Sequence, residues 1–202
     1  MTRTPRRPWM QGLALLALSS AAGSAFAHTG AAPGAHMHVG FMDGLVHPFT
    51  GLDHLMAMLV VGLWSATTMR RWWIPPLVFV QMLLAGAMLG LTGAQLPVVE
   101  PMIASSLVVL GLLLGARKQL PLAFGAALVG LFAVFHGWAH GSELTGSTQA
   151  WLPLAGMVLS TIALHAMGVF IGLWVRTRNP NWSRIAGAVV AMTGGALLLQ
   201  LV

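Results

Sequence analysis

The stretch HPFTGLDH, residues 47–54, stands at the start of a long apolar run. It places two imidazoles and a carboxylate, those of His47, His54 and Asp53, where a membrane-spanning helix normally carries Leu, Val or Ile. An ionisable side chain in the middle of a bilayer costs about 3 kcal/mol or more unless it is paired or hydrated. These three residues are therefore candidates for function, and the apolar run around them predicts a membrane helix.

The composition supports an integral membrane protein. Of the 202 residues, 57% are hydrophobic and only 7% are charged, which is too apolar for an ordinary soluble domain. The formal net charge is +6, but the basic residues occur singly or in pairs between apolar runs, so no nucleic-acid partner is expected. The chain has no cysteine, which excludes disulfides and thiolate metal sites.

Residues 1–27 have the pattern of a secretory signal peptide. A segment with three arginines precedes a short apolar stretch, and small residues at the end form a cleavage signal, AFA at residues 25–27. Cleavage would make His28 the mature N-terminus and leave residues 28–43 as an extracytoplasmic segment. The alternative is an uncleaved membrane anchor.

Six apolar stretches follow, each close to the ~20 residues with which a helix crosses about 30 Å of hydrocarbon. They run roughly over residues 44–68, 73–92, 99–116, 121–140, 151–175 and 183–202. Lipid offers the backbone no hydrogen bonds, so helices are expected. The predicted fold is an all-α bundle of six transmembrane helices over residues 44–202.

The basic residues predict the orientation of this bundle. They follow the first, third and fifth spans: Arg70, Arg71, Arg117, Lys118, Arg176, Arg178 and Arg184. The positive-inside rule then places these loops in the cytoplasm and both mature termini on the periplasmic side of the inner membrane. The signal peptide predicts the same orientation independently.

Glycine is abundant, with 24 residues, and is often spaced by four, which lets helix backbones approach closely. A tight bundle is expected. No ATP-binding loop of the GxxxxGK[ST] type occurs, so any transport would be passive, ion-coupled or driven by a partner. Acid-and-histidine faces lie three spans apart, in the first and fourth spans, so spans 1–3 and 4–6 are candidates for a 3+3 inverted repeat.

The fourth span carries His136, His140 and Glu143 at i, i+4 and i+7. This spacing places them on one helix face, where two histidines can bind one metal ion. The intervening residues include no Glu in the base position of an HExxH protease, so protease chemistry is not indicated. The alternative is that the two imidazoles hydrogen-bond to neighbouring helices.

In the first span Asp43, His47 and His54 stand at i, i+4 and i+11, but Pro48 intervenes. Either the helix is kinked at Pro48 or Pro48 is its first residue. Along an ideal helix His47 and His54 would lie ~10 Å apart. They would therefore bind an ion in successive steps, unless the break brings them together. Asp53 is either a ligand or the acceptor that orients an imidazole.

Other polar residues carry weaker signals. Glu100 is either a helix-start carboxylate or a ligand from a third helix, and His165 is a ligand or a satisfied interior histidine. Met56 and Met58 are consistent with copper(I) but are common packing residues. The predicted N-terminal segment contains His28, His36 and His38, which would capture metal outside the membrane or be incidental to a disordered leader.

Both motifs resemble those of a known family. HPFTGLDH matches the HPxxGxDH signature of the HupE/UreJ family of nickel/cobalt permeases, and FHGWAHGSE at residues 135–143 matches its FHGxAHGxE signature. The resemblance implies a secondary transporter or facilitator of Ni²⁺ or Co²⁺ that supplies nickel enzymes such as hydrogenase or urease. It also implies metal roles for residues of both motifs: His47, Asp53, His54, His136, His140 and Glu143.

The donor chemistry agrees, since imidazole and carboxylate suit borderline divalent ions. Imidazole binds metal only when neutral, so binding should weaken as the pH falls toward about 6.5, the ordinary pKa of histidine. The expected function is transport rather than enzymatic catalysis, with the metal ion as cargo and no prosthetic group. The alternatives are a histidine-ligated haem protein and a metal sensor that does not transport. The sequence excludes neither a monomer nor a homo-oligomer.

Overall fold

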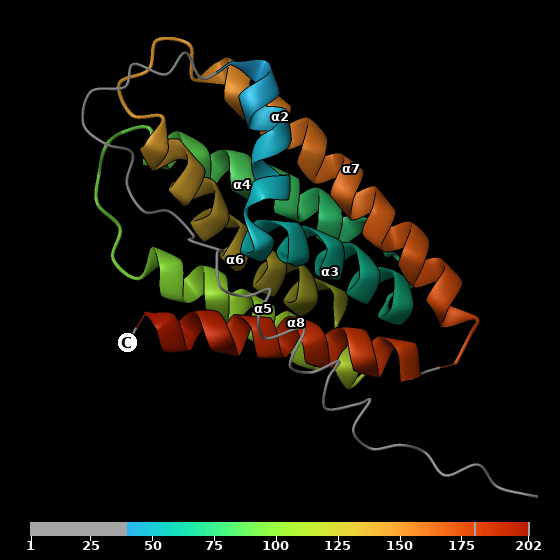
Figure 1. Cartoon of the computed structure of the whole chain (residues 1–202). Coiled ribbons are helices and arrows are strands. Elements are labelled where there is room, and N and C mark those ends of the chain that lie inside the picture. Colours follow the sequence, from blue (N-terminus) through green and yellow to red (C-terminus); the bar gives the residue numbers. More distant parts are fainter. Residues whose placement is uncertain (1–39, 180, 202) are drawn as a thin grey trace, which may run out of the picture. The chain divides into compact units, whose positions relative to one another are not determined.

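The computed structural model describes residues 40–179 and 181–201. Over these residues the chain forms seven helices and no strand, which confirms the all-α prediction (Figure 1). The predicted signal peptide and all but the last four residues of the predicted N-terminal segment lie outside the described residues. The helices are α2 (Phe41–Thr50), α3 (Leu52–Thr68), α4 (Ile74–Gly90), α5 (Val99–Gly115), α6 (Leu122–Glu143), α7 (Trp151–Arg176) and α8 (Asn181–Gln200).

Three of these helices, α6, α7 and α8, are long and apolar enough to cross a membrane. The pair α2 and α3 passes the same test as one broken span, which raises the number among the described residues to four. The remaining apolar helices, α4 and α5, have 17 residues each and reach only about 25 Å. The helices identify a membrane protein, while the expected number of six spans is not established by their lengths.

The first span is broken at Gly51, where the chain bends by 82° between α2 and α3. Gly51 has extended backbone angles, φ −96° and ψ 115°. The prediction that Pro48 is the first residue of the helix was wrong, because this residue lies inside α2, which continues past it to Thr50. The predicted break in the first span is present, but it falls at Gly51, three residues after Pro48. A proline removes only one backbone donor. The Thr50 hydroxyl donates to the His47 carbonyl at 2.7 Å, so a side chain satisfies one of the carbonyls left at the end of α2.

The main helix pairs are α4 with α6, α5 with α8, and α3 with α7. Glycines allow these close approaches, as expected from their spacing. A Cβ atom added to Gly137 would overlap the Leu83 carbonyl, and one added to Gly141 would overlap the Ala87 carbonyl. The α4–α6 contact therefore fixes the rotation of α6 about its axis, and with it the direction of the His136 and His140 side chains.

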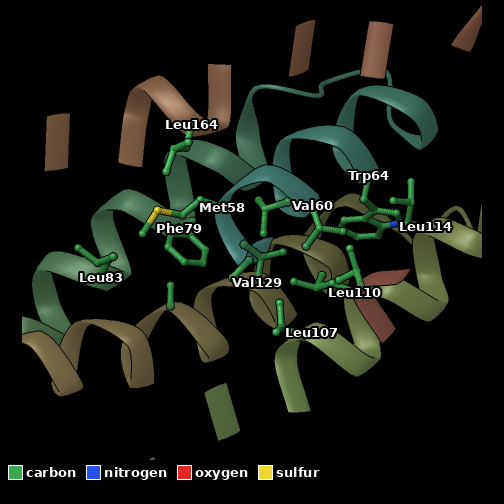
Figure 2. Close-up of a cluster of buried hydrophobic side chains, with 14 of the residues drawn as sticks. Met58, Val60, Trp64, Phe79, Leu83, Leu107, Leu110, Leu114, Val129 and Leu164 are labelled. Carbon is green, nitrogen blue, oxygen red and sulfur yellow. The ribbon is translucent and has the colours of Figure 1, made fainter. Parts of the chain in front are cut away.

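An apolar core fills the space between these pairs (Figure 2). Its largest side chains are fully buried and come from five helices: Met58, Trp64, Phe79, Leu83, Leu107, Leu110, Leu114, Val129 and Leu164. Large apolar side chains also lie on the outer surface, such as Phe170 at 74% exposed and Leu199 at 79% exposed. An apolar outer surface around an apolar core is expected for a protein surrounded by lipid.

Candidate metal centre

Two imidazoles of α6 point into the interior of the bundle. His136 and His140 are both 0% exposed. The Nδ1 atom of His136 lies 3.0 Å from the Phe132 carbonyl oxygen, one turn earlier in the helix. A carbonyl can only accept a hydrogen bond, so Nδ1 carries the proton and Nε2 carries a lone pair. That Nε2 atom is buried and has no hydrogen-bond partner among the described residues. An unprotonated imidazole nitrogen is the form that can bind a metal ion.

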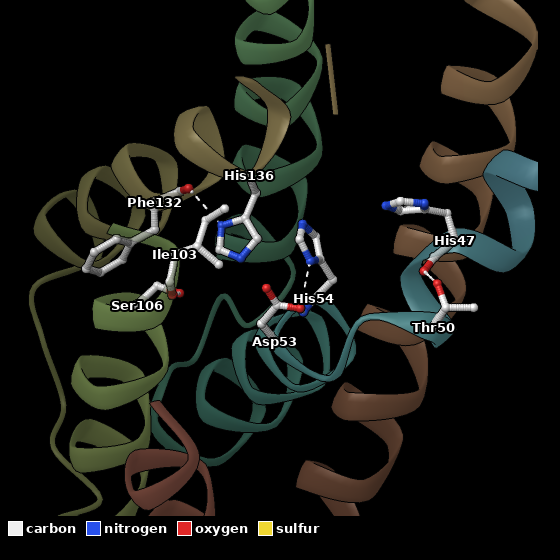
Figure 3. Close-up of polar contacts among 8 residues, drawn as sticks. All are labelled: His47, Thr50, Asp53, His54, Ile103, Ser106, Phe132 and His136. Carbon is white, nitrogen blue, oxygen red and sulfur yellow. Dashed lines mark hydrogen bonds and ion pairs between the residues drawn. The ribbon is translucent and has the colours of Figure 1, made fainter. Parts of the chain in front are cut away.

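Asp53 and His54 form a buried pair in the first turn of α3 (Figure 3). One carboxylate oxygen of Asp53, Oδ1, accepts from the His54 backbone N–H at 2.9 Å and from His54 Nδ1 at 3.0 Å. The first contact satisfies a backbone donor that the start of a helix leaves without a partner. The second places the proton on Nδ1 and directs Nε2 away from Asp53, as in the carboxylate–histidine–metal arrangement.

Gly51 makes room for this pair. A Cβ atom at Gly51 would lie 2.9 Å from Asp53 Oδ1 and 3.3 Å from His54 Nδ1. The break in the first span therefore has two effects. It turns the chain between α2 and α3. Because Gly51 has no side chain, the Asp53 carboxylate and the His54 imidazole can also pack directly against it.

The break also brings the histidines of both motifs together. The ring centroids of His54 lie 4.5 Å from His140, 5.1 Å from His136 and 6.2 Å from His47. Figure 3 shows the His54 ring between those of His136 and His47. The separation of ~10 Å expected for an ideal helix is thus replaced by close contact. We name these four residues, His47, His54, His136 and His140, the histidine cluster.

A carboxylate completes one end of the histidine cluster. Ligand atoms of His47, His140 and Glu143 all lie within 4.8 Å of one another. Bonds from a first-row dication to nitrogen or oxygen are about 2.0–2.2 Å, so neighbouring ligand atoms lie about 3 Å apart. A small inward movement of side chains would close the group around one ion. Glu143 is exposed, His47 is partly buried and His140 is fully buried, so this group leads from the surface to the interior.

The structure places the remaining candidate residues elsewhere. Asp43 is exposed, and its Oδ2 accepts a hydrogen bond from the Gly40 N–H at 2.7 Å. This bond caps the start of α2. Glu100 is exposed in the first turn of α5. His165 is buried in α7, where its ring contacts Phe79 at 4.9 Å. Three further predicted ligands lie outside the described residues: His28, His36 and His38.

The sequence did not indicate Phe79 as part of the site. Its ring lies 5.6 Å from His136 and 4.9 Å from His165, measured between centroids. No motif distinguishes this phenylalanine from the others in the chain. The break at Gly51 had only a weak signal, because an isolated glycine in a helical pattern is sometimes the end of a helix.

Apolar helices around a group of imidazoles, one buried carboxylate and one exposed carboxylate define a membrane protein with a candidate metal site. Comparison with known proteins identifies the family. The model of the family described as HupE / UreJ protein matches residues 16–197, so the chain belongs to the HupE/UreJ family. It is similar to Protein HupE of Rhizobium leguminosarum bv. viciae, with 40% identity over 172 residues that cover 82% of this chain and 90% of the relative. No solved structure matches the chain.

Proposed function

We propose that this protein is a permease that carries Ni²⁺, or Co²⁺, across the inner membrane into the cytoplasm to supply nickel enzymes such as hydrogenase or urease. The observation that carries the proposal is the histidine cluster. Four imidazoles from two separate motifs are joined by ring contacts, with His54 touching the other three, and Glu143 stands at the exposed end. The two motifs resemble those of nickel/cobalt permeases, and their nitrogen and oxygen donors suit these ions.

In this proposal the residues take different roles. Glu143, His47 and His140 receive the ion at the surface, because their ligand atoms are already close together. His54 and His136 then bind it in the interior, where both rings are buried. Asp53 orients His54 and supplies a negative charge that offsets part of the cost of bringing a dication into the membrane.

The proposed topology is six spans with both mature termini in the periplasm. The pair α2 and α3 forms one broken span, as in transporters whose binding sites lie at helix breaks. The short helices α4 and α5 would cross as well, since 17 residues is at the lower limit for a span. The basic residues then fall in loops and at adjoining helix ends on one side, which the positive-inside rule assigns to the cytoplasm.

The helix pairs support an inverted repeat. Exchanging α3, α4 and α5 with α6, α7 and α8 converts the pair α3–α7 into the pair α6–α4, and it leaves α5–α8 unchanged. All three main pairs are therefore consistent with a pseudo-two-fold relation. The histidine cluster lies between the broken span α2–α3 and α6, the first spans of the two halves, which is where a transporter's site is expected.

The alternatives gain less support. Two axial histidines of a haem must lie on opposite faces of a flat macrocycle. His54 and His140 are instead in direct contact, with ring centroids 4.5 Å apart. A sensor needs no ligands buried in the membrane interior, because it can bind metal at the surface at lower cost.

Flux into proteoliposomes tests the proposal. Vesicles containing the purified protein should take up Ni²⁺, and His47→Ala or His140→Ala should reduce uptake to the level of empty vesicles. Gln149→Ala serves as a control because it removes an exposed polar side chain from the loop after α6 and should leave uptake unchanged. Competition with Co²⁺, Zn²⁺ and Cu²⁺ measures the preference. Wild-type vesicles that pass none of these ions would overturn the proposal.

A further inference from the structure

The directions of the described helices bring their basic residues to one end of the bundle. Helices α4 and α6 run in parallel, because Gly86 of α4 packs on the Val134 carbonyl. One turn later in both helices, Gly90 packs on the Trp138 carbonyl. The glycines of α7 meet α3 in the same ascending order, while those of α8 meet α5 in descending order. Short connections follow α3, α5 and α7, so these three helices end where α4, α6 and α8 begin.

Six exposed cations of the described residues lie at this end, and we name them the basic end: Arg70, Arg71, Lys118, Arg176, Arg178 and Arg184. Every carboxylate side chain of the chain lies at the opposite end, in the first turns of α2, α3 and α5 or at the end of α6. The 22 residues of α6 separate the two ends by about 33 Å. Salt screens charges over about 8 Å at physiological ionic strength, so these carboxylates do not neutralise the basic end.

Two of these cations belong to neighbouring helix ends. At the start of α8 the Arg184 carbonyl oxygen lies 3.7 Å from the position of a Cβ atom added to Gly115, the last residue of α5. The Lys118 N–H donates to the Leu113 carbonyl at 2.9 Å, which turns the chain back over the end of α5. Like charges are thus held at adjacent helix ends, and the repulsion between them falls when anions lie against them.

Exposed tryptophans indicate the depth of the basic end in the membrane. Trp174 and Trp182 are exposed at the end of α7 and at the start of α8. Tryptophan is enriched where membrane helices reach the lipid headgroups, because its ring is apolar and its N–H is polar. The Arg178 guanidinium lies over the Trp174 ring, with Cζ 5.2 Å from the ring centroid. Stacking occupies the face of the guanidinium and leaves the N–H donors at its edge for an anion.

We propose that the basic end binds the phosphate headgroups of anionic phospholipids, such as phosphatidylglycerol. Guanidinium and ammonium groups donate charge-assisted hydrogen bonds to phosphate oxygens. The tryptophans place these donors at the depth of the headgroups, and no carboxylate side chain of the chain competes with the lipid there. Bound headgroups reduce the repulsion between the ends of α5, α7 and α8, so anionic lipid stabilises the bundle. This inference does not require transport and holds with or without a metal ion.

Two triple variants separate charge from packing at the basic end. The first, Lys118→Gln/Arg178→Gln/Arg184→Gln, removes three charges and keeps long polar side chains. The Lys118 carbonyl can still accept from Trp64, because the substitution changes only the side chain. The matched control, Lys118→Arg/Arg178→Lys/Arg184→Lys, changes the same three side chains and keeps every charge.

The first measurement is the association of spin-labelled lipids with the purified full-length protein in bilayers, without added metal. The wild type and the charge-retaining control should prefer phosphatidylglycerol over phosphatidylcholine several-fold, and the glutamine variant should lose most of this preference. The preference should also fall in about 1 M NaCl, because screening then acts over about 3 Å. Equal association of the two lipids with the wild type, or an unchanged preference in the glutamine variant, would overturn the proposal.

The second measurement is thermal unfolding in detergent micelles that contain added lipid. Replacing phosphatidylcholine by phosphatidylglycerol should raise the melting temperature of the wild type and of the charge-retaining control, and it should raise that of the glutamine variant less. Inorganic phosphate added with phosphatidylcholine distinguishes a free anion from a lipid, and an equal rise in that sample would overturn lipid binding. Failure of the proposed function gives a different result, because wild-type vesicles would then pass no Ni²⁺ while the lipid preference persists.

Discussion

Near its start α3 carries His54, which is 1% exposed, and about three turns later it carries Trp64, which is 0% exposed. The two side chains are about equally buried, but the polar side chains around them differ in whether their polar atoms have hydrogen-bond partners. Trp64 Nε1 donates to the Lys118 carbonyl at 3.1 Å, and the hydroxyls of Ser65 and Thr68 donate to carbonyls of α3. In this apolar region these three polar side chains all donate hydrogen bonds to backbone carbonyls.

Around His54 the pattern is reversed. His136 uses one nitrogen to bond the backbone and directs the other, Nε2, into the interior without a hydrogen-bond partner among the described residues. A protein normally avoids such atoms because each costs stability. We infer that the apolar half of α3 contributes mainly to stability, while the half at His54 gives up some stability for the proposed metal site. Substitutions in the two halves should therefore separate flux from stability.

Among substitutions that compare the two halves of α3, the largest effect on flux is expected for His136→Asn. The asparagine amide keeps a donor for the Phe132 carbonyl, so the melting temperature should change little, but Nε2 is lost. Ni²⁺ flux in proteoliposomes should fall roughly 100-fold or more, since a lost ligand costs more than the roughly 10–100-fold lost with an outer partner. Flux within threefold of the wild type would show that His136 is an ordinary interior histidine.

A smaller effect is expected for Asp53→Asn. The amide oxygen can still accept from the His54 backbone N–H and from Nδ1, so the orientation of the ring persists, but the negative charge is removed. Ni²⁺ affinity should fall roughly 10–100-fold, as for other carboxylates behind a metal-binding histidine. Equilibrium binding measures this directly. An affinity equal to that of the wild type would contradict the role of Asp53 in charge compensation.

Gly51→Ala should have a moderate and local effect. The backbone angles of Gly51 are open to alanine, but the new Cβ would press on Asp53 Oδ1 at 2.9 Å and on His54 Nδ1 at 3.3 Å. We expect a several-fold loss of Ni²⁺ affinity with little change in melting temperature. The matched control is Gly195→Ala on α8, where no atom lies within 4 Å of the added Cβ. Equal Ni²⁺ affinities in the two variants would show that space at Gly51 is unimportant.

The sequence predicted the helical fold well, and it singled out histidines that the structure brings close together. The apolar stretches correspond to the described helices, with ends that differ by a few residues, because hydrophobic length is visible in the sequence. The i, i+4, i+7 spacing placed two histidines and a carboxylate on one face of α6, and the structure brings two of them together with His47. Helical periodicity is a local property, so a single sequence reveals it.

The sequence could not predict what depends on contacts between helices. Pro48 was the obvious interruption in the first span, yet the bend occurs at Gly51, where the missing side chain accommodates Asp53 and His54. Phe79 was not identified, because its contacts are with rings on helices that are distant in sequence. The length of α4 and α5 also depends on where neighbouring loops turn.

The smallest expected effect is that of Trp64→Phe in the apolar half of α3. Phenylalanine keeps most of the ring volume but loses the Nε1 donor, which leaves the Lys118 carbonyl without this bond. The bundle should lose about 1 kcal/mol of stability. Thermal unfolding in detergent measures the loss, and Ni²⁺ flux below the melting temperature should equal that of the wild type. A flux defect as large as that of His136→Asn would mean that the apolar half takes part in transport, and the division of α3 into a stabilising half and a ligand-holding half would be wrong.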